Sequence, residues 1–489
     1  MALSSFFRRL PGRGPVKYLY IAIPVLAVEW ILFKCYYPFA DFFTDSYSYI
    51  EAAANHDAIG YRPIGYSLFL RLVHALWTSD TFLVTVQYML VQGACLGLFL
   101  TLVRRCGLGP RTSNVLLGFV LLDPTIPYLC NYVSSDALFV GLSIIWLTVL
   151  MGMLRAPTWW RLALQVVLLF MIFNVRYIAL YYPAVASLSF LLLRKKAPVY
   201  FKLTGIACSI GVVVICTNWI KHITYEETGA ETFSAFSGWQ IANNALHLYP
   251  FLPVDTAGLP SPATTELAAD VRDFFARTGP ELLKRGPVST TEYMWVPGSP
   301  LHIYMNTLRK RQHTTYFTAW NRVAPVFTEY GYFLVRRHPL AYIRYYGWNS
   351  AMSFFVSPLD VFGVYNEGKP TVDMVAVRWF RYRGKRVRAW SFTGQEALLA
   401  PWPWIALYLN FAFVITTLWY LFSRKRREAN LVFMGSLELT AAYLLSNAVF
   451  CIAASPSVFR YQILPIILLF FFMVAALGIL WERRTVENL

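Results

Sequence analysis

The segment YQILPIILLFFFMVAALGILW, residues 461–481, carries no charged side chain. An α-helix rises 1.5 Å per residue, so a stretch of this length and polarity crosses the roughly 30 Å hydrocarbon core of a bilayer. Arg483 and Arg484 follow it closely. Basic residues of this kind are typical of the cytoplasmic end of a span. The segment therefore predicts a membrane helix that ends in the cytoplasm.

Further apolar blocks along the chain extend this prediction to a polytopic membrane protein. Hydrophobic residues make up 57% of the chain and charged residues 14%, whereas soluble domains have about 45–50% and about 25%. The predicted spans are 17–37, 81–103, 114–131, 136–154, 162–175, 177–193, 203–220, 399–422, 430–452 and 461–481. The fifth is short, and Arg176 separates it from the sixth. The predicted fold is all-α, with about ten spans.

Basic residues predict the orientation of these spans. With the N-terminus in the cytoplasm, every short cytoplasmic loop is basic, as the positive-inside rule requires. The basic residues concerned are Arg8, Arg9, Arg13, Lys17, Arg104, Arg105, Arg111, Arg155, Arg161, Arg194, Lys195, Lys196, Lys202, Arg424, Lys425, Arg426, Arg427, Arg483 and Arg484. They account for much of the net charge of +17, so we expect no nucleic-acid partner. The first span lacks a small-residue cleavage site, and we expect it to be retained.

Two long segments remain outside the cytoplasm, 38–80 and 221–398. In the second, 262–285 has the pattern of an amphipathic helix. Residues 326–357 are apolar and aromatic but contain arginines, which predicts a helix on the membrane surface; a re-entrant segment is the alternative. The predicted organisation is an N-terminal membrane module (1–220), an extracytoplasmic region (221–398) and a C-terminal group of spans (399–489).

The first outer loop carries acids and an arginine beside helix-breaking residues. Asp41 and Asp45 follow the first span, and Tyr49 lies four residues after Asp45, on the same helical face. Arg62 stands in YRPIGY, where Pro63 and Gly65 interrupt a helix and expose the arginine and backbone N–H groups. A solvated turn is the alternative for the two acids.

Other charged residues are predicted at the outer ends of later spans. Asp136 lies in NYVSSDALF, Arg176 precedes Tyr177, and Arg460 precedes Tyr461. Sequence-distant acids and arginines therefore meet one face of the membrane. Each has a structural alternative: Asp136 is also suited to a helix N-cap, and arginine beside tyrosine is a common interfacial anchor.

Residues 45–68 resemble the first outer loop of GT-C type membrane glycosyltransferases. More narrowly, they are similar to the bacterial family related to protein mannosyltransferases and lipid A aminoarabinose transferases. The family pattern is an acid opening D-[ES]-x-x-Y-x-x-x-A, then a basic residue before P-P-G-Y-P-L. The residues matched here are Asp45, Ser46, Tyr49, Ala53, Arg62, Pro63, Gly65, Tyr66 and Leu68. Ser46 replaces a frequent Glu, and Ile64 replaces the second proline.

The resemblance implies transfer of a sugar from a polyprenyl-phosphate carrier to a lipid, glycan or protein acceptor, with inversion. The acceptor hydroxyl needs a general base, for which Asp45 is the first candidate and Asp41 the second. Arg62, then Arg460 and Arg176, would stabilise the leaving phosphate. We expect the site to face the periplasm from a bacterial inner membrane. With Ser46 in place of an acid and no histidine cluster, we expect no metal or other cofactor.

Residues of the kinds that contact sugars extend the predicted site. Trp239, Gln240, Asn243 and Asn244 are of types that stack on sugars and hydrogen-bond their hydroxyls. With Tyr49, Tyr66, Asp136 and Tyr461, they form the predicted substrate- or acceptor-binding set. For 233–250 a packed outer helix is the alternative. The basic run RWFRYRGKRVR, 378–388, fits lipid headgroups or an anionic acceptor, with a solvated hairpin as its alternative.

Two other functions compete with glycosyl transfer. A transporter or flippase of lipid-linked sugars requires charges within spans, and the candidates are Glu29, Asp123 and Glu438. An O-antigen polymerase or ligase would use outer-loop arginines without the acids of the first loop. The seven cysteines form no CxxC pair and the seven histidines no HExxH motif, so neither a disulfide framework nor a zinc site is predicted.

Overall fold

The protein is all-helical in its computed structural model, which describes residues 14–193, 197–285, 289–423, 431–454 and 457–481. Helices account for 79% of the structure, and across these ranges the β-structure is limited to two isolated bridges. The predicted fold class, an all-α polytopic membrane protein, is confirmed at this level. Several predicted flanking residues lie outside the described ranges. They are Arg8, Arg9, Arg13, Arg194, Lys195, Lys196, Arg424, Lys425, Arg426, Arg427, Arg483 and Arg484.

The chain divides into two compact units. Unit 1 comprises Met1–Val213, Pro358–Ser446 and Phe459–Leu489, and unit 2 comprises Val214–Ser357 and Asn447–Val458. Two of the four boundaries fall inside long helices, α11 (Val199–Thr228) and α23 (Leu431–Ala454). Residues 358–398, which we had grouped with the extracytoplasmic region, therefore fold with the membrane helices of unit 1.

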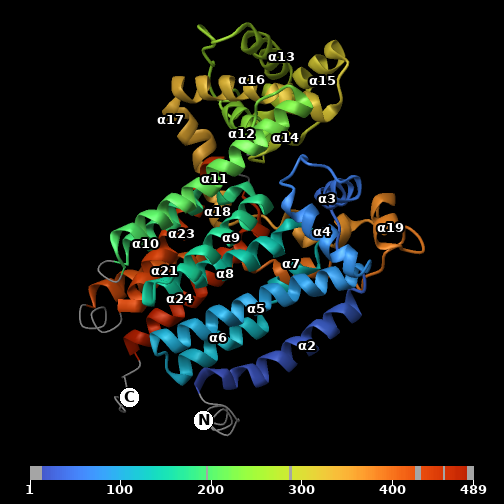
Figure 1. Ribbon diagram of the computed structural model, residues 1–489. Helices are drawn as coiled ribbons and strands as arrows, with labels where there is room; N and C mark the ends of the chain where they lie inside the picture. Colours follow the sequence, from blue (N-terminus) through green and yellow to red (C-terminus); the bar gives the residue numbers. More distant parts are fainter. Residues whose placement is uncertain (1–13, 194–196, 286–288, 424–430, 455–456, 482–489) are drawn as a thin grey trace. The chain divides into compact units, whose positions relative to one another are not determined.

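Unit 1 contains most of the apolar helices. Its helices are α2 (Leu19–Tyr36), α3 (Thr44–Asn55), α4 (Gly65–Leu76), α5 (Asp80–Cys106), α6 (Pro110–Leu122), α7 (Thr125–Asn131), α8 (Ser135–Arg155), α9 (Trp159–Val175), α10 (Tyr182–Leu191), α19 (Met374–Phe380), α20 (Gly394–Leu399), α21 (Trp402–Phe422) and α24 (Ile463–Trp481). Short helical turns are η1 (Gly14–Tyr18), η2 (Tyr177–Tyr181), η5 (Asp360–Gly363), η6 (Tyr365–Gly368) and η7 (Phe459–Gln462). Figure 1 shows α5, α8 and α9 side by side.

Eight helical segments among the described residues are long and apolar enough to cross a membrane. They are Val16–Tyr36, Asp80–Cys106, Pro110–Asn131, Ser135–Arg155, Val199–Thr228, Gly394–Phe422, Leu431–Ala454 and Phe459–Trp481. Each corresponds to a predicted span. The remaining two predicted spans correspond to shorter apolar helices, Trp159–Val175 and Tyr177–Leu191. A helix satisfies its own backbone hydrogen bonds, which explains why apolar segments of this length adopt it in lipid.

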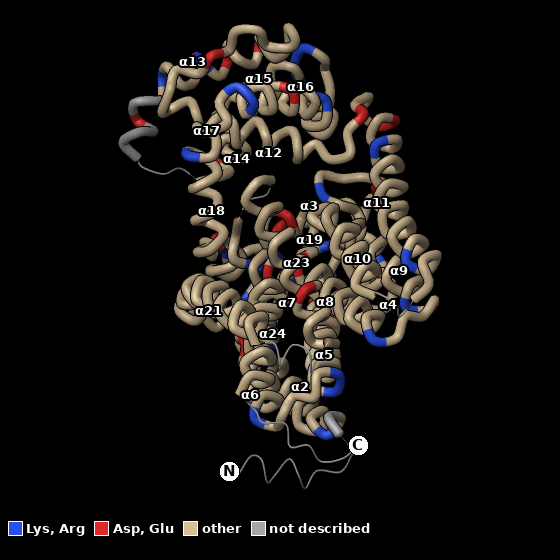
Figure 2. The backbone as a smooth tube through the Cα atoms, turned by 90° about the vertical axis from the view of Figure 1, so that its left-hand side faces the viewer, with Lys and Arg blue, Asp and Glu red and all other residues tan. Residues whose placement is uncertain are grey.

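The ends of these helices in unit 1 define a common layer. α2 and α7 end close to where α5 and α8 begin, because Asp41 pairs with Tyr132 in a parallel bridge. Tyr132 OH donates to Val361 O at 2.7 Å, and Tyr365 OH donates to Ala40 O at 3.0 Å. Segments from the first loop, the turn before α8 and residues 358–393 thus pack together there. Arg104, Arg105 and Arg155 lie at the opposite ends of α5 and α8, and Figure 2 shows basic residues at that end of α5.

Unit 2 is a smaller helical bundle with a mixed aromatic core. Its helices are α12 (Ala235–Leu246), α13 (Pro262–Arg285), α14 (Glu292–Trp295), α15 (Pro300–Gln312), α16 (Tyr316–Arg337), α17 (Pro339–Tyr342), η4 (Ile343–Gly347) and α18 (Trp348–Phe355). α12 packs closely on α16 because Gly238 has no side chain: a Cβ there would lie 2.2 Å from Ala324 O. The predicted helix 262–285 is confirmed as α13. The predicted helix 326–357 is instead interrupted near Pro339, and its position on a membrane stays a prediction.

Candidate functional site

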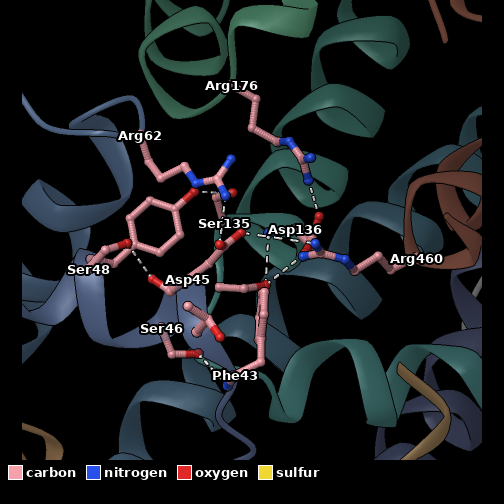
Figure 3. Close-up of polar contacts among 12 residues, drawn as sticks. Phe43, Asp45, Ser46, Ser48, Arg62, Ser135, Asp136, Arg176 and Arg460 are labelled. Atoms are coloured by element: carbon pink, nitrogen blue, oxygen red, sulfur yellow. Dashed lines mark hydrogen bonds and ion pairs between the residues drawn. The ribbon is translucent and has the colours of Figure 1, made fainter. Parts of the chain in front are cut away.

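Five charged side chains from distant parts of unit 1 converge at the layer formed by the helix ends (Figure 3). Asp45 and Arg62 come from the first loop. Asp136 begins α8, Arg176 follows α9, and Arg460 lies in η7 just before α24. All five were predicted as site residues from the sequence. Their convergence defines the candidate site.

Asp45 and Arg62 form the pair contributed by the first loop. Asp45 occupies the first turn of α3, where the helix dipole favours an acid. Arg62 lies in the turn before α4, and its Nη2 donates to Asp45 Oδ1 at 2.7 Å. α4 begins at Gly65, as the Pro63–Gly65 break predicted. A Cβ at Gly65 would lie 2.6 Å from the backbone of Asn174, so glycine lets this turn approach the end of α9.

Asp136 is the most buried acid of the site, and it binds two arginines. Arg176 donates to Asp136 Oδ1, and Arg460 Nη1 donates to Oδ2 at 2.9 Å. The alternative that Asp136 caps α8 is wrong, because Ser134 is the N-cap residue and its Oγ accepts from Asp136 N. Ser134 Oγ also donates to Asp136 Oδ2 at 2.9 Å. Charged and neutral donors together compensate the buried carboxylate.

Arg460 connects the two halves of the site. Besides Asp136, it faces Asp45, with Nη2 4.0 Å from Oδ2. The charges thus alternate in the order Arg62, Asp45, Arg460, Asp136, Arg176. Three positive and two negative groups leave a formal net charge of +1 (3 − 2). The side chains of Asp45 and Arg62 are 18% and 25% exposed, against 3% for Asp136. Asp136 is therefore the buried member, and the first-loop pair and Arg176, at 17%, remain accessible.

Aromatic rings hold the arginines in position. The Arg176 guanidinium lies 4.1 Å from the centroid of the Tyr461 ring, and Arg460 lies 4.9 Å from the same ring. Arg460 also lies 4.6 Å from the Phe43 ring. Cation–π contacts of this kind fix guanidinium planes without neutralising them. The arginines therefore keep their charge and a defined orientation.

Two further predicted site residues, Tyr49 and Tyr66, are buried and hold the elements of the site together. Tyr49 OH donates to Ser135 Oγ at 3.0 Å, which ties α3 to the start of α8. Burial raises the pKa of Tyr49, and nearby Asp45 acts in the same direction. Tyr66 OH donates to Gln87 Oε1 at 2.7 Å. Both rings are buried and pack edge to face at 4.9 Å, so they position α3 and α4 rather than offering a free surface.

Asp41 lies apart from the arginines. Its carboxylate is buried and accepts a hydrogen bond from Asn366 N at 2.7 Å. Burial raises the pKa of Asp41 to about 8, and the bond from Asn366 opposes that shift. Asn366 and Glu367 both have positive φ angles, which non-glycine residues rarely adopt. Asp41 therefore holds a strained turn, and the structure does not bring it into the charged cluster.

The four predicted residues of α12 are packed inside unit 2. Trp239 stacks on Trp320 with ring centroids 3.9 Å apart, and its Nε1 donates to Trp320 O. Gln240 donates to Asn244 at 2.7 Å, and Asn243 donates to Thr290 O at 2.7 Å. All four side chains are almost fully buried. This arrangement matches the packed-helix alternative, and it leaves no ring face or amide open to a sugar.

No group of three or more His, Cys, Asp or Glu side chains within the described ranges is arranged to hold a metal ion. Ser46 is buried, and its Oγ accepts from Phe43 N at 3.1 Å. Its hydroxyl thus caps the start of α3.

Sequence reasoning missed several supporting residues. Ser134 and Ser135 bind Asp136 and Tyr49, and their adjacency to Asp136 was the available signal. Glu367 accepts from Thr44 N and Oγ1, both at 3.2 Å, beside Asp45. Glu367 is over three hundred positions away from Thr44, so no local pattern indicates this contact.

Searches with this chain against models of known families, curated proteins and solved structures found no match. The class of the protein therefore follows from its own fold: it is an all-helical, polytopic membrane protein. The particular feature of this one is an alternating arrangement of two acids and three arginines at one end of its membrane helices.

Proposed function

We propose that the protein is a membrane glycosyltransferase that moves a sugar from a polyprenyl-phosphate donor to an acceptor hydroxyl outside the cytoplasm. The observation that carries the proposal is the accessible Asp45–Arg62 pair, continued by Arg460, Asp136 and Arg176. A base and a set of phosphate-binding cations adjoin each other there, as this chemistry requires. The resemblance of residues 45–68 to GT-C glycosyltransferases supports the same proposal.

The reaction assigns a role to each group. The acceptor oxygen attacks the anomeric carbon and its proton passes to Asp45. The bond from that carbon to the phosphate oxygen breaks, and the leaving phosphate keeps the electron pair. Attack opposite the leaving group inverts the configuration. Arg62 and Arg460 would stabilise the added negative charge, with Arg176 and Asp136 holding Arg460 in place.

The Asp45–Arg62 ion pair also explains how the site would be switched on. While Arg62 donates to Asp45 Oδ1, that carboxylate oxygen is not free to accept a hydrogen bond from an acceptor hydroxyl. A donor phosphate competes for Arg62, because arginine binds phosphate in the same bidentate manner as carboxylate. Donor binding would then release Asp45 for the acceptor hydroxyl. The expected substrates are a polyprenyl-phosphate sugar and a lipid, glycan or protein acceptor, at the periplasmic face of a bacterial inner membrane.

The test is transfer of labelled sugar by the full-length protein purified in detergent, with a panel of short-chain polyprenyl-phosphate donors and candidate acceptors. Asp45→Asn and Arg62→Ala should each reduce transfer about 100-fold or more. Asp57→Asn and Arg71→Ala are matched controls from the same loop and should retain transfer. Equal transfer by wild type, Asp45→Asn and Arg62→Ala would reject the proposed roles.

A transporter of lipid-linked sugars is the second candidate, and one observation favours it. The span Pro110–Asn131 is broken into α6 and α7 at Asp123 and Pro124. Asp123 is buried, its Oδ1 accepts from Thr125 N at 2.9 Å, and its Oδ2 has no partner among the described residues. Broken spans with buried acids are typical of transporters. Translocation of a fluorescent lipid-linked sugar in proteoliposomes, lost in Asp123→Asn but not in Asp45→Asn, would favour this candidate.

A further inference from the structure

The basic run at 378–388 folds into a hairpin in unit 1. Thr371 and Arg386 form an antiparallel bridge, Val372 N donates to Lys385 O at 2.9 Å, and Val387 N donates to Pro370 O at 3.0 Å. Its apolar side chains, such as Phe380 and Val387, are buried. The basic side chains all remain exposed: Arg378, Arg381, Arg383, Lys385, Arg386 and Arg388. The fold therefore exposes six cations on this one element, which we call the basic hairpin.

The charge of the basic hairpin is not neutralised by the protein. None of its six cations takes part in an ion pair within the described ranges, although ion pairs occur elsewhere in both units. The nearest acid along the chain is Asp373, whose side chain caps α19 by accepting from Val375 N at 2.9 Å. Six like charges within eleven residues repel one another, so a bound anion would stabilise the surface.

Two hydrogen bonds fix this surface at the ends of membrane spans. Tyr382 OH donates to Asp80 Oδ2 at 2.6 Å, and Asp80 begins α5. Trp390 N donates to Tyr36 O at 2.8 Å, and Tyr36 ends α2. Trp77, which follows α4, and Trp390 are 65% and 75% exposed. Exposed tryptophan beside arginine is typical of the interface between bilayer and water.

A groove runs along the edge of the hairpin. It is open, has a volume of about 480 Å³, and is lined by His74, Ala75, Leu76, Trp77, Thr78 and Arg381. The His74 ring packs on Trp379 with centroids 4.1 Å apart, and its Nδ1 is shielded from solvent without a partner among the described residues. Burial, and then the nearby Arg381, lower the pKa of His74. The groove thus has a mainly polar lining that includes one cation, Arg381, while exposed Leu76 and Trp77 lie at its margin.

We propose that this groove and the basic hairpin bind the phosphate-bearing headgroup of an anionic lipid in the surrounding bilayer. Arg381 would contact the phosphate, with the His74 ring lining the groove beside it, and the other hairpin cations would contact neighbouring headgroups. Leu76 and Trp77 would lie against the first part of the acyl chains. The proposal does not depend on the glycosyltransferase function, because it concerns binding of a bulk membrane lipid rather than a substrate.

The experiment is lipid binding by the full-length, detergent-purified protein, measured by native mass spectrometry while phosphatidylglycerol or phosphatidylcholine is titrated. We expect preferential binding of phosphatidylglycerol, reduced about 10-fold or more in the triple variant Arg381→Ala, Arg383→Ala, Lys385→Ala. His74→Ala should reduce it by a smaller factor. The matched control is Arg272→Ala, Arg277→Ala, Lys310→Ala, which removes three cations from unit 2 and should bind as wild type. No sugar donor is present, so failure of the proposed enzyme activity cannot affect the result.

Two outcomes of the lipid titration would overturn the proposal. One is equal retention of both lipids by the wild type. The other is unchanged phosphatidylglycerol binding in the hairpin variant, provided that its thermal midpoint shows it to be folded. A competition experiment distinguishes specific binding of phosphate from general electrostatic attraction. Glycerol phosphate should displace the lipid more effectively than sodium chloride at the same ionic strength. Equal displacement by the two salts would mean that the lipid is held only by non-specific electrostatic attraction, and it would also reject the proposed site.

Discussion

Two regions of this protein contain residue types that suit a sugar-processing site, and their structures differ. In unit 1, Asp45, Arg62 and Arg460 converge with part of their surface open to solvent. In unit 2, Trp239 and Asn243 are just as suitable chemically but lie in a packed core. Residue type alone therefore made both regions candidates for a sugar-binding site. Only the neighbours determine whether a polar group meets a ligand or another part of the chain.

The difference has a physical basis. Asn243 and Asn244 find complementary donors and acceptors within unit 2, so their burial carries a small net cost. Arginines do not lose their charge, and the cluster in unit 1 contains one more of them than acids. It therefore stays at a helix-end layer with solvent access. The excess positive charge is what makes this cluster the better candidate for binding an anion.

The largest effect is expected for Asp136→Ala. It leaves Arg176 and Arg460 without their shared carboxylate, and breaking a buried ion pair typically costs about 3–5 kcal/mol. Both the thermal midpoint in detergent and sugar transfer should fall. Asp45→Ala, which removes the more exposed acid, should lower transfer with a much smaller change in the midpoint. If the two variants were equally stable, the contrast between the buried and accessible halves of the cluster would be wrong.

Trp239→Ala should test the opposite region. Removing a fully buried tryptophan leaves a cavity and costs about 3–5 kcal/mol of stability. Transfer per folded molecule should stay at the wild-type level, measured after removing unfolded protein by size-exclusion chromatography. Trp348→Ala, at an exposed position of the same unit, is the control and should change the midpoint little. A selective loss of activity in folded Trp239→Ala would instead indicate that α12 takes part in substrate binding.

Gly65→Ala should have an intermediate effect. The added Cβ would lie 2.6 Å from the backbone of Asn174, and overpacking of this kind costs about 1–3 kcal/mol. The turn carrying Arg62 would shift away from the end of α9, so transfer should fall with the thermal midpoint. Gly60→Ala is the matched control, because its Cβ would meet nothing closer than 3.6 Å. Equal midpoints for the two variants would contradict the close contact.

Asp41→Asn should have an effect that depends on pH and is small in acidic solution. Burial raises the pKa of Asp41 to about 8 from an ordinary value of 3.8, so the folded state holds a proton that the unfolded state releases. Wild-type stability should therefore fall as pH rises from about 4 to about 8 and then level off. Asn keeps an acceptor for Asn366 N without this titration. The thermal midpoint of the variant minus that of the wild type should increase between pH 5 and pH 8. A constant difference would show that Asp41 does not titrate in this way.

Much of the fold was determined by the sequence alone. Apolar length predicts the membrane helices, because a helix of about 20 apolar residues is the only open-ended structure that satisfies its backbone in lipid. The segment 461–481 is one such case, and α24 with η7 occupies it. The break at Pro63 and Gly65 also followed from local chemistry, since proline lacks an N–H donor and glycine lacks a Cβ.

The tertiary structure decided the partners of each charge. Asp45 faces Arg62 and Arg460, whereas Asp41, four residues earlier, is buried against Asn366, and all of these partners come from other segments of the chain. The same holds for Trp239, whose ring is covered by Trp320 from another helix. Burial and ion pairing depend on contacts between residues far apart in sequence, whereas hydropathy and helix breaking are local. The helices could therefore be predicted from the sequence, whereas the arrangement of the candidate site became clear only from the tertiary structure.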